Sequence, residues 1–405
     1  MYNIKLTDYI PVPQPATTDR IVAAHYYAAW KKGAAGLHNG FDDLHEYPER
    51  TPLMGYYDEE SPEVADWEIK WALEHGINCF IHCWYRKKYN EGHPVTVEDL
   101  RCGHGLHEAL FNAKYQQMMK FAIMFENGNR WGNTDPQDMV ENLMPFWTEQ
   151  YFKRENYLKL DNKPVLFVCG KANLDKAFAD AAEQRAVFDK CREYAKTQGF
   201  DGLVIAVNIW DGNEVDTALY LDCTERGYDF HFGYNSGYAP EENLPPEDEV
   251  IEGQCEVLKK RLAPDPMRRV PTASCFRDPS PRTTKAWNDL GYKFGEIKCY
   301  HLSPNGYRTV IRKMKEMVDA LPDGAWGKRI FMIDNWNEWD EGHYVSPSHE
   351  FGFRYLQAIR EELTERDNLP DYRMPQDLGL SANLNKSWTV PDLGPFCEKR
   401  LNEQK

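Results

Sequence analysis

The sequence RIFMIDNWNEWDEG, residues 329–342, joins an apolar run to a cluster of acidic and aromatic side chains. Its first half, RIFMIDN, is too apolar and β-branched for a solvated helix face, and it predicts a buried strand. Its second half carries two carboxylates, Glu338 and Glu341, beside Trp336 and Trp339. Glycoside cleavage commonly needs two carboxyl groups, and indoles offer flat apolar surfaces for sugar rings. The stretch therefore indicates sugar-cleaving chemistry at the end of a strand, in preference to an acidic run at the start of a surface helix.

The strand pattern recurs along the chain, in alternation with helical patterns. Eight apolar, β-rich runs share it: IVAAHYY (21–27), INCFIHCWY (77–85), FAIMFEN (121–127), PVLFVCG (164–170), LVIAVNI (203–209), DFHFGYN (229–235), VPTASCF (270–276) and IFMIDNW (330–336). Eight strands with intervening helices predict a single (β/α)8 TIM barrel of the α/β class.

The segments between the runs carry helix signals. Three helices have recognisable starts, at Ser61-Pro62, Asp135-Pro136 and Ser303-Pro304. The helix before the last strand has apolar side chains three or four residues apart, which predict one buried stripe. These side chains are Val310, Met314, Met317 and Leu321.

Three strand-to-helix connections are long, at 28–60, 86–105 and 277–302. Loops on this face build the site in barrels of this kind. We predict one barrel domain over residues 1–367. The segment 368–405 has little periodicity, and we expect it to be a tail that packs on the barrel.

Composition limits the partners. The chain has 405 residues and a formal net charge of -16, which makes nucleic acid or an anionic membrane surface a poor partner. The sequence has no run of 18 apolar residues, so we do not expect membrane insertion. The amino terminus lacks the features of a secretory signal, so we expect a cytoplasmic protein by default, or a periplasmic or extracellular one if a signal was trimmed. The oligomeric state stays open.

No cofactor motif stands out. The ten cysteines form no CxxC pair, and Cys79, Cys83, Cys169 and Cys275 lie in apolar runs, which predicts free core thiols. No serine-hydrolase elbow, P-loop or dinucleotide fingerprint follows a strand. His104 has a spacing to His107 that could suit zinc, but no third fixed ligand is evident. We predict neither a cofactor nor a metal.

Polar and aromatic residues gather at the predicted carboxyl ends of the strands, where barrels expose catalytic groups. We predict Glu338 and Glu341 as the catalytic pair. The predicted substrate-binding residues are Tyr26, Tyr27, Trp30, His82, Trp84, Tyr85, Glu126, Asn127, Trp210, Tyr234, Asp278, Arg282, Trp336 and Trp339.

Strand alternation places Trp336 and Glu338 on one face, toward the barrel axis. Glu341 can join Glu338 only if the chain turns after Trp339, as Gly342 allows. The paired carboxylates therefore require a tight turn.

Several of the binding residues have a second interpretation. Tyr26, Tyr27, Trp84 and Tyr85 either fill the upper barrel or form a sugar platform, and together they favour a platform. A carboxylate such as Glu126 is costly to bury without a partner or a purpose.

The role of one arginine is open in the same way. Arg282 either pairs with Asp278 or touches substrate.

At the level of family, the chain resembles the WbsX-like group, often labelled as glycosyltransferases of polysaccharide synthesis, and through it glycoside hydrolase family 99. The resemblance covers about residues 20–365. It rests on AHYYAAW near the first strand, GYYDEESPEVADWEIKWALEHGINCFIHCWY at 55–85, YLKLDNKPVLFV at 157–168, and WNEWDEGHYVSP with FGFRYLQAI at 336–359. The group's usual glycine-tryptophan-aspartate run appears here as Cys275-Phe276-Arg277-Asp278.

The resemblance implies a retaining glycosidase without a glycosyl-enzyme ester. Glu338 would remove the proton from the sugar's 2-hydroxyl, which attacks the anomeric carbon to give a 1,2-anhydro sugar. Glu341 would protonate the leaving oxygen, and water would then open the ring. This route suits α-mannosides and α-L-rhamnosides in an oligosaccharide or polysaccharide. It requires a raised pKa for Glu341, which burial and neighbouring carboxylates are expected to supply.

Two other functions compete with this interpretation. A glycosyltransferase should carry diphosphate-binding features, and no clear set is evident in this acidic chain. A non-catalytic glycan-binding barrel would fit the loss of a carboxylate, but both are present. Sugar identity, linkage and internal or terminal cleavage are not determined by the sequence.

Overall fold

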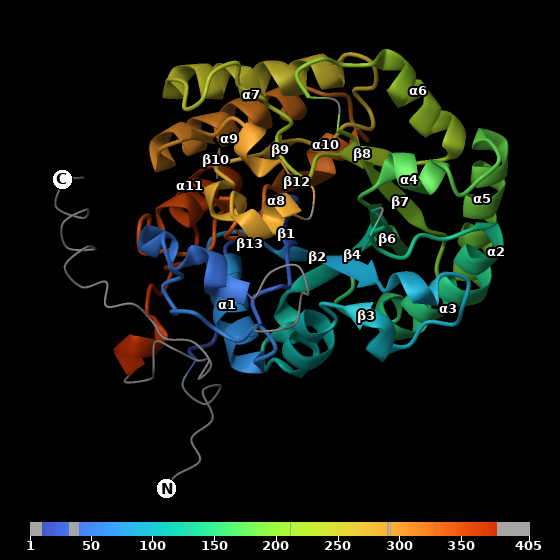
Figure 1. The fold of residues 1–405 in the computed structure, drawn as a ribbon, viewed down its shortest axis with the longest axis horizontal. Coiled ribbons are helices and arrows are strands. Elements are labelled where there is room, and N and C mark those ends of the chain that lie inside the picture. The colour runs from blue at the N-terminus through green and yellow to red at the C-terminus, as the bar shows by residue number, and fades with distance from the viewer. Residues whose placement is uncertain are drawn as a thin grey trace, which may run out of the picture.

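The computed structural model describes residues 10–31, 40–128, 130–210, 212–289, 291 and 293–378. Its centre is a ring of parallel strands in the order β8-β7-β6-β4-β2-β1-β12-β9 (Figure 1). Each predicted run overlaps one of them: β1 (Ile21–Tyr26), β2 (Cys79–Arg86), β4 (Lys120–Glu126), β6 (Lys163–Val168), β7 (Val204–Asn208), β8 (Phe230–Phe232), β9 (Thr272–Ala273) and β12 (Ile330–Ile333). The predicted (β/α)8 barrel is confirmed.

The ring closes between β8 and β9 through a short seam. A single parallel bridge joins His231 to Arg269. Two backbone hydrogen bonds make it, from His231 N to the carbonyl of Arg268 and from Val270 N to the carbonyl of His231. The side chain of Arg269 adds a bond to the carbonyl of Phe232, at 3.0 Å. The seam is far shorter than the ladder between β2 and β4, which pairs Cys79 through Tyr85 with Lys120 through Glu126.

Helices surround the strands (Figure 1). The longer ones are α1 (Pro62–Glu74), α5 (Ala181–Thr197), α6 (Thr217–Arg226), α7 (Glu247–Leu262), α9 (Pro304–Asp319) and α11 (Arg354–Leu363). The shorter ones are α2 (Pro136–Asp138), α3 (Met144–Trp147), α4 (Lys171–Asp175), α8 (Lys285–Asp289) and α10 (Trp326–Arg329), with π-helical turns at Met139–Leu143 and Thr148–Phe152. No helix among the described residues is long and apolar enough to cross a membrane.

The three predicted helix starts are confirmed at Pro62, Pro136 and Pro304. Asp135 accepts hydrogen bonds from two backbone amides of the next turn, and Ser303 accepts one from Gly306.

The predicted stripe on α9 is corrected at its end. Its buried side chains include Tyr307, Val310, Ile311, Met314 and Val318. Met317 and Leu321 are only partly buried, because the helical period carries the buried face through Val318 instead.

Short strands complete the loops: β3 (Leu100–Arg101), β5 (Lys159–Leu160), β10 (Phe276–Arg277), β11 (Tyr300–His301), β13 (Asn337–Glu338) and β14 (His343–Tyr344). The β3 strand folds back on β2, and β10 pairs with β11 within the long loop after β9.

The start of the predicted tail lies against α1. Trp71 donates its indole hydrogen to the carbonyl of Arg373, and Lys70 donates to the carbonyl of Asp371. Residues 379–405 lie outside the described residues. The boundary at 367 stays a prediction.

Candidate active site

A hairpin above the barrel carries both predicted catalytic carboxylates. Strands β13 and β14 pair through Asn337 with Tyr344 and Glu338 with His343. The turn between them contains Gly342 at φ +60°, where a β-carbon would meet the carbonyl oxygen of Asp278 at 2.3 Å. Glycine is therefore required at this position. The turn after Trp339 that the sequence demanded is present.

One guanidinium binds the whole acidic hairpin. Arg282 donates to Glu338 at 2.8 Å and to Asp340 at 2.9 Å, and it also contacts Glu341. It is buried, with Trp287 and Phe294 packed at its sides at 4.8 and 5.3 Å from the guanidinium carbon. Arg282 therefore does not pair with Asp278, which instead binds Arg50 at 2.6 Å. The ion-pair interpretation of Arg282 with Asp278 is therefore wrong, and contact between Arg282 and substrate stays a prediction.

The two carboxyl groups of the pair hold protons differently. Burial, and then the charge of Glu341, raises the pKa of Glu338 to about 8. Burial also opposes the ionised form of Glu341, but Arg282 and a hydrogen bond with His343 outweigh it and lower the pKa of Glu341 well below its usual range. The expectation of a raised pKa for Glu341 is therefore wrong for the free protein. The sequence did not reveal that two cations converge on this side chain.

His343 is one of these cations, and the sequence analysis missed it. Its Nδ1 lies 2.7 Å from Asp334 and its Nε2 lies 3.0 Å from Glu341. Burial opposes its charge, yet the two carboxylates raise the pKa of His343 to about 10. A signal was available, since WNEWDEGHYVSP places this histidine two residues after the second glutamate.

Four of the predicted binding residues face the barrel mouth around this pair. Tyr234 donates its hydroxyl to Glu338 at 2.6 Å. The ring of Tyr27 lies 6.0 Å from the Arg282 guanidinium carbon and 6.5 Å from the ring of Tyr85. Glu126 stands beside Tyr85 in the strand register. Burial raises the pKa of Glu126 to about 7, and the negative charge of Glu341 adds to the shift.

Four other predicted binding residues point outward, into the helix layer. Tyr26 donates its hydroxyl to Glu68 of α1 at 2.7 Å, and Trp336 donates its indole hydrogen to the same carboxylate at 2.9 Å. The ring of His82 packs on Tyr26, at 4.4 Å. Side chains of residues that pair in register on parallel strands point to the same face of the sheet. This explains why the side chains of Tyr26 and His82 both point to the outer face of the barrel.

The fourth of these is Trp84, which donates to the hydroxyl of Tyr151 at 2.9 Å. These four assignments are corrected from substrate contact to packing. For Trp336 the physical reason is Asn335, whose φ of +45° breaks the strand alternation assumed between Ile333 and Glu338.

Four more of the predicted binding residues hold the loops in place. Trp339 is buried and donates to the hydroxyl of Tyr57 at 3.1 Å. Trp30 is buried against Phe41, at a ring separation of 4.9 Å. Asn127 donates to the carbonyl of Gly170 and accepts from its amide.

The fourth is Asp278, whose backbone amide donates to the carbonyls of Glu341 and Gly342. We therefore correct Trp339, Trp30 and Asp278 to positioning roles. Asn127 also borders a polar cleft on the barrel rim, and its contact with substrate stays a prediction. By contrast, Trp210 is 58% exposed and lines a small cleft of about 150 Å³ together with Tyr234.

Two buried glutamates support the hairpin from below, and the sequence analysis did not single them out. Glu59 accepts from the side chain of Asn337 at 2.9 Å, and Glu68 accepts from Trp336. Burial, and then the charge of Glu59, raises the pKa of Glu68 to about 8. These carboxyl groups hold the two residues that precede Glu338.

The cysteines and histidines set aside above have structural surroundings. Cys79, Cys83 and Cys275 are buried free thiols, as predicted, and Cys169 is partly buried. Nε2 of His104 lies 3.7 Å from Glu59, whereas Nε2 of His107 lies 3.0 Å from the hydroxyl of Tyr151. Among the residues that the structure describes, no group of three or more His, Cys, Asp or Glu side chains is arranged to hold a metal.

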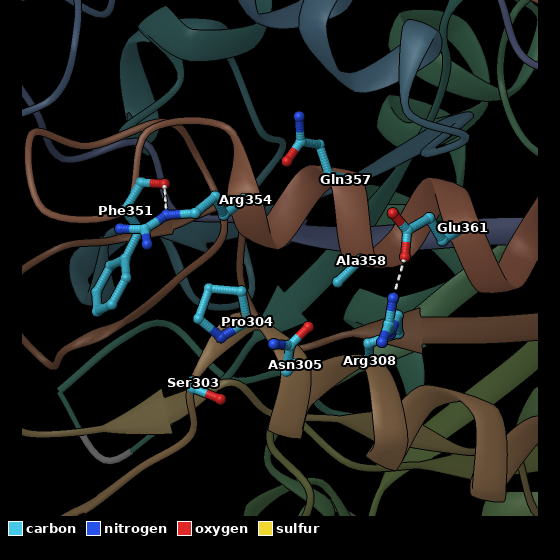
Figure 2. Close-up of a pocket in the computed structure, with 9 residues that line it drawn as sticks. All are labelled: Ser303, Pro304, Asn305, Arg308, Phe351, Arg354, Gln357, Ala358 and Glu361. Carbon is cyan, nitrogen blue, oxygen red and sulfur yellow. Dashed lines mark hydrogen bonds and ion pairs between the residues drawn. The ribbon is translucent and has the colours of Figure 1, made fainter. Parts of the chain in front are cut away.

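A separate cleft of about 430 Å³ lies between α9 and α11 (Figure 2), and neither Glu338 nor Glu341 lines it. Its charges are already engaged with the protein. Arg308 binds Glu361 at 2.7 Å, and Arg354 donates to the carbonyl of Phe351.

A (β/α)8 barrel with two carboxylates on the loops at its mouth is an architecture that glycan-active enzymes use. The chain belongs to the WbsX family, since the family model described as "Glycosyltransferase WbsX" matches residues 123–359, more than half of the chain.

Two relatives come from two strains of Xanthomonas campestris pv. campestris, and both are named "Uncharacterized protein WxcX". They are 22% and 21% identical to this chain, over 83% and 88% of its length. The matches cover 47% and 51% of the relatives, so the chain spans about half their length.

Solved structures share the fold. A protein described as "Glycoside hydrolase-like protein" has a TM-score of 0.57 and 16% identity, over 89% of this chain and 99% of that one. A GH99 endo-alpha-mannosidase from Bacteroides thetaiotaomicron has a TM-score of 0.55 and 13% identity, over 85% of this chain and 96% of that one. At this level of identity the likeness concerns the fold alone.

Proposed function

We propose that the protein is a retaining glycoside hydrolase that cleaves α-mannoside-like or α-L-rhamnoside-like linkages in a glycan. The observation that carries the proposal is the binding of Glu338 and Glu341 by one buried guanidinium, that of Arg282. Glycoside hydrolysis commonly uses two carboxyl groups that act at the same linkage. Two carboxylates that bind one guanidinium are close enough to act in this way.

The protonation state of the two carboxyl groups also supports the proposal. A pKa of about 8 for Glu338 and a lowered pKa for Glu341 give the pair one proton at neutral pH. One acid and one base are what the anhydro-sugar route requires: Glu338 takes the proton of the 2-hydroxyl, and Glu341 gives a proton to the leaving oxygen. In the free protein the single proton rests on Glu338, so substrate binding has to transfer it to Glu341 before the bond breaks. Such a proton belongs to the coupled pair rather than to one residue.

The decisive experiment separates the acid from the base. Glu338→Gln and Glu341→Gln are each assayed on two kinds of α-mannoside and α-L-rhamnoside. Alkyl glycosides have a poor leaving group that needs a proton, whereas dinitrophenyl glycosides release dinitrophenolate, which leaves without protonation. Loss of the acid should abolish turnover of the alkyl glycoside but spare the dinitrophenyl glycoside, whereas loss of the base should abolish both. We expect the spared variant to be Glu341→Gln. Sparing in Glu338→Gln would reverse the roles, and full activity of either variant on both substrates would overturn the proposal.

The configuration of the first product tests the stereochemistry. Proton NMR of the nascent sugar should show the retained anomer, and an inverted product would discard the anhydro-sugar route.

A second candidate, glycosyl transfer, is favoured by the description of the family model. It predicts that a nucleotide sugar is the donor and that a hydroxyl of an acceptor glycan, in place of water, is the nucleophile. Incubation with a panel of nucleotide sugars and glycan acceptors, followed by mass spectrometry, would reveal an acceptor extended by one sugar.

A further inference from the structure

A polar cleft of about 500 Å³ lies on the barrel rim, where the loops after β2, β4 and β6 meet. The loop after β2 contributes Glu91, and the loop after β4 contributes Asn127 and Trp131. The segment after β6 contributes Asn173, which lies in α4, and Lys176, which directly follows that helix. Loops on this side of the barrel also carry the candidate carboxylates. The cleft has no part in the chemistry proposed above.

The cleft lies next to the barrel mouth. Its wall residue Asn127 directly follows Glu126, the carboxylate at the end of β4. The ring of Trp131 lies 5.3 Å from the ring of Tyr85, which stands beside Glu126 in the strand register. Tyr85 in turn lies 6.5 Å from Tyr27, beside Arg282. Trp131, Tyr85 and Tyr27 thus form a chain of ring contacts from the cleft to Arg282, which binds the carboxylate pair.

The walls are fixed by hydrogen bonds within the protein. The side chain of Asn133 accepts from Asn127 at 3.1 Å and donates to the carbonyl of Asn173 at 2.8 Å. The guanidinium of Arg101 lies 4.1 Å from the Trp131 ring centroid and holds the indole in place. The site is therefore preformed, which lowers the entropic cost of binding.

The remaining groups suit an uncharged polyhydroxylated ligand. In the part of the chain that the structure describes, neither the Asn173 amide group nor the Lys176 ammonium has a hydrogen-bond partner in the protein, and both border the cleft. Lys88 and Lys176 are balanced by Glu91 and Asp135 in the same lining, so the cleft carries no net formal charge. The half-buried Trp131 indole supplies an apolar surface beside these donors.

We infer that this cleft is a second sugar-binding site, which holds a neutral pyranose of the same glycan, some units away from the linkage at Glu338 and Glu341. The inference rests on the proposed function for the identity of the glycan. The protein is then expected to bind extended glycan chains, with an affinity that increases with chain length until the chain reaches Trp131 and Asn173.

The test uses Glu338→Gln to prevent turnover. Isothermal titration with α-manno-oligosaccharides and α-L-rhamno-oligosaccharides of one to six units should show an affinity that rises at least tenfold between the shortest and the longest ligand. Adding Asn173→Ala and Lys176→Ala should remove this gain while leaving the affinity for the shortest ligand unchanged. A matched control, Asn305→Ala with Lys190→Ala, changes the same residue types at exposed positions elsewhere and should keep the gain.

Each outcome decides the inference. Affinity that does not depend on length, or a length gain that survives Asn173→Ala with Lys176→Ala, would overturn it. The proposed function is tested separately with the wild-type protein and dinitrophenyl glycosides, which are too short to reach the cleft. If the dinitrophenyl glycosides are hydrolysed but affinity does not rise with oligosaccharide length, only the second sugar-binding site is contradicted. If affinity rises with length but no glycoside is hydrolysed, only the proposed hydrolase activity is contradicted.

Discussion

Nε2 of His343 lies 3.0 Å from Oε2 of Glu341, so a buried imidazolium stands directly beside the second carboxylate of the candidate pair. Its other nitrogen lies 2.7 Å from Asp334, and both ring nitrogens are thereby committed. With a pKa of about 10, His343 is charged throughout the neutral range. It stabilises the ionised forms of the pair.

Replacing His343 by glutamine should therefore shift the pH profile of turnover upward. The positive charge lowers the pKa of each nearby carboxyl group, so its loss should raise both apparent pKa values of the pair. In the wild type we expect kcat/KM to fall above a pH of about 8, where Glu338 loses its proton. In His343→Gln both limbs of the profile should move to higher pH, and a downward shift of either limb would contradict the assignment.

Tyr234→Phe should lower kcat/KM with little effect on stability. The hydroxyl donates to Glu338 at 2.6 Å, and a hydrogen bond to a charged or reacting group contributes enough for a roughly tenfold to hundredfold loss. Tyr355→Phe is the matched control, because its buried hydroxyl binds the carbonyl of Leu302 instead. Thermal unfolding should place both variants near the wild type, and equal activities in the two would remove Tyr234 from the site.

Arg282→Met should abolish turnover and also destabilise the protein. The substitution removes the buried cation that Glu338, Asp340 and Glu341 share, at a cost on the order of 3 kcal/mol in the free energy of unfolding. Arg308→Met is the control, since its ion pair with Glu361 is partly exposed and should contribute less than about 1 kcal/mol. Urea unfolding measures both, and a similar cost for the two variants would contradict the central role of Arg282.

Glu68→Gln should flatten part of the pH dependence of stability. The pKa of Glu68 is raised from 4.5 to about 8 in the folded protein, so its contribution is fully present below pH 4.5 and is lost as pH rises through 8. Between these limits the free energy of unfolding falls by about 1 kcal/mol per pH unit for such a group. Glutamine mimics the neutral acid and should remove this slope.

The measurement is the melting temperature of wild type and Glu68→Gln at intervals between pH 4.5 and 9. Glu338 and His343 add slopes of the same sign, so only the difference between variant and wild type is informative. Glu141→Gln, at an exposed position, should reproduce the wild-type curve.

The barrel was predictable because each strand carries its own local signal. A β-branched apolar run such as LVIAVNI at 203–209 is buried on both faces in a closed parallel barrel, and this leaves a clear mark in the sequence. Helix starts at Asp135 and Ser303 were equally local. The directions of side chains at the mouth were not, since one residue with a positive φ, Asn335, sends Trp336 outward to Glu68 and still returns Glu338 to the mouth.

The electrostatics of the pair were also beyond the sequence. Arg282 lies 56 residues before Glu338 in a long loop, and nothing in the spacing says that it binds three carboxylates of one hairpin. The effect of Arg282 and His343 on Glu341 depends on that tertiary arrangement. Expected pKa values could not be assigned before the cations were placed.

The short seam between β8 and β9 has a mechanical consequence. The barrel is a rolled sheet whose edges are joined at this seam by two backbone hydrogen bonds. The long ladder between β2 and β4 lies on the opposite side of the ring. Hydrogen exchange should therefore reach the amides of His231 and Val270 before those of the β2–β4 ladder. Tyr234 follows β8 on one side of the seam, whereas Glu338 follows β12 on the other side. Their hydrogen bond thus joins the two sides of the seam, so the candidate site spans the most sparsely paired junction of the ring.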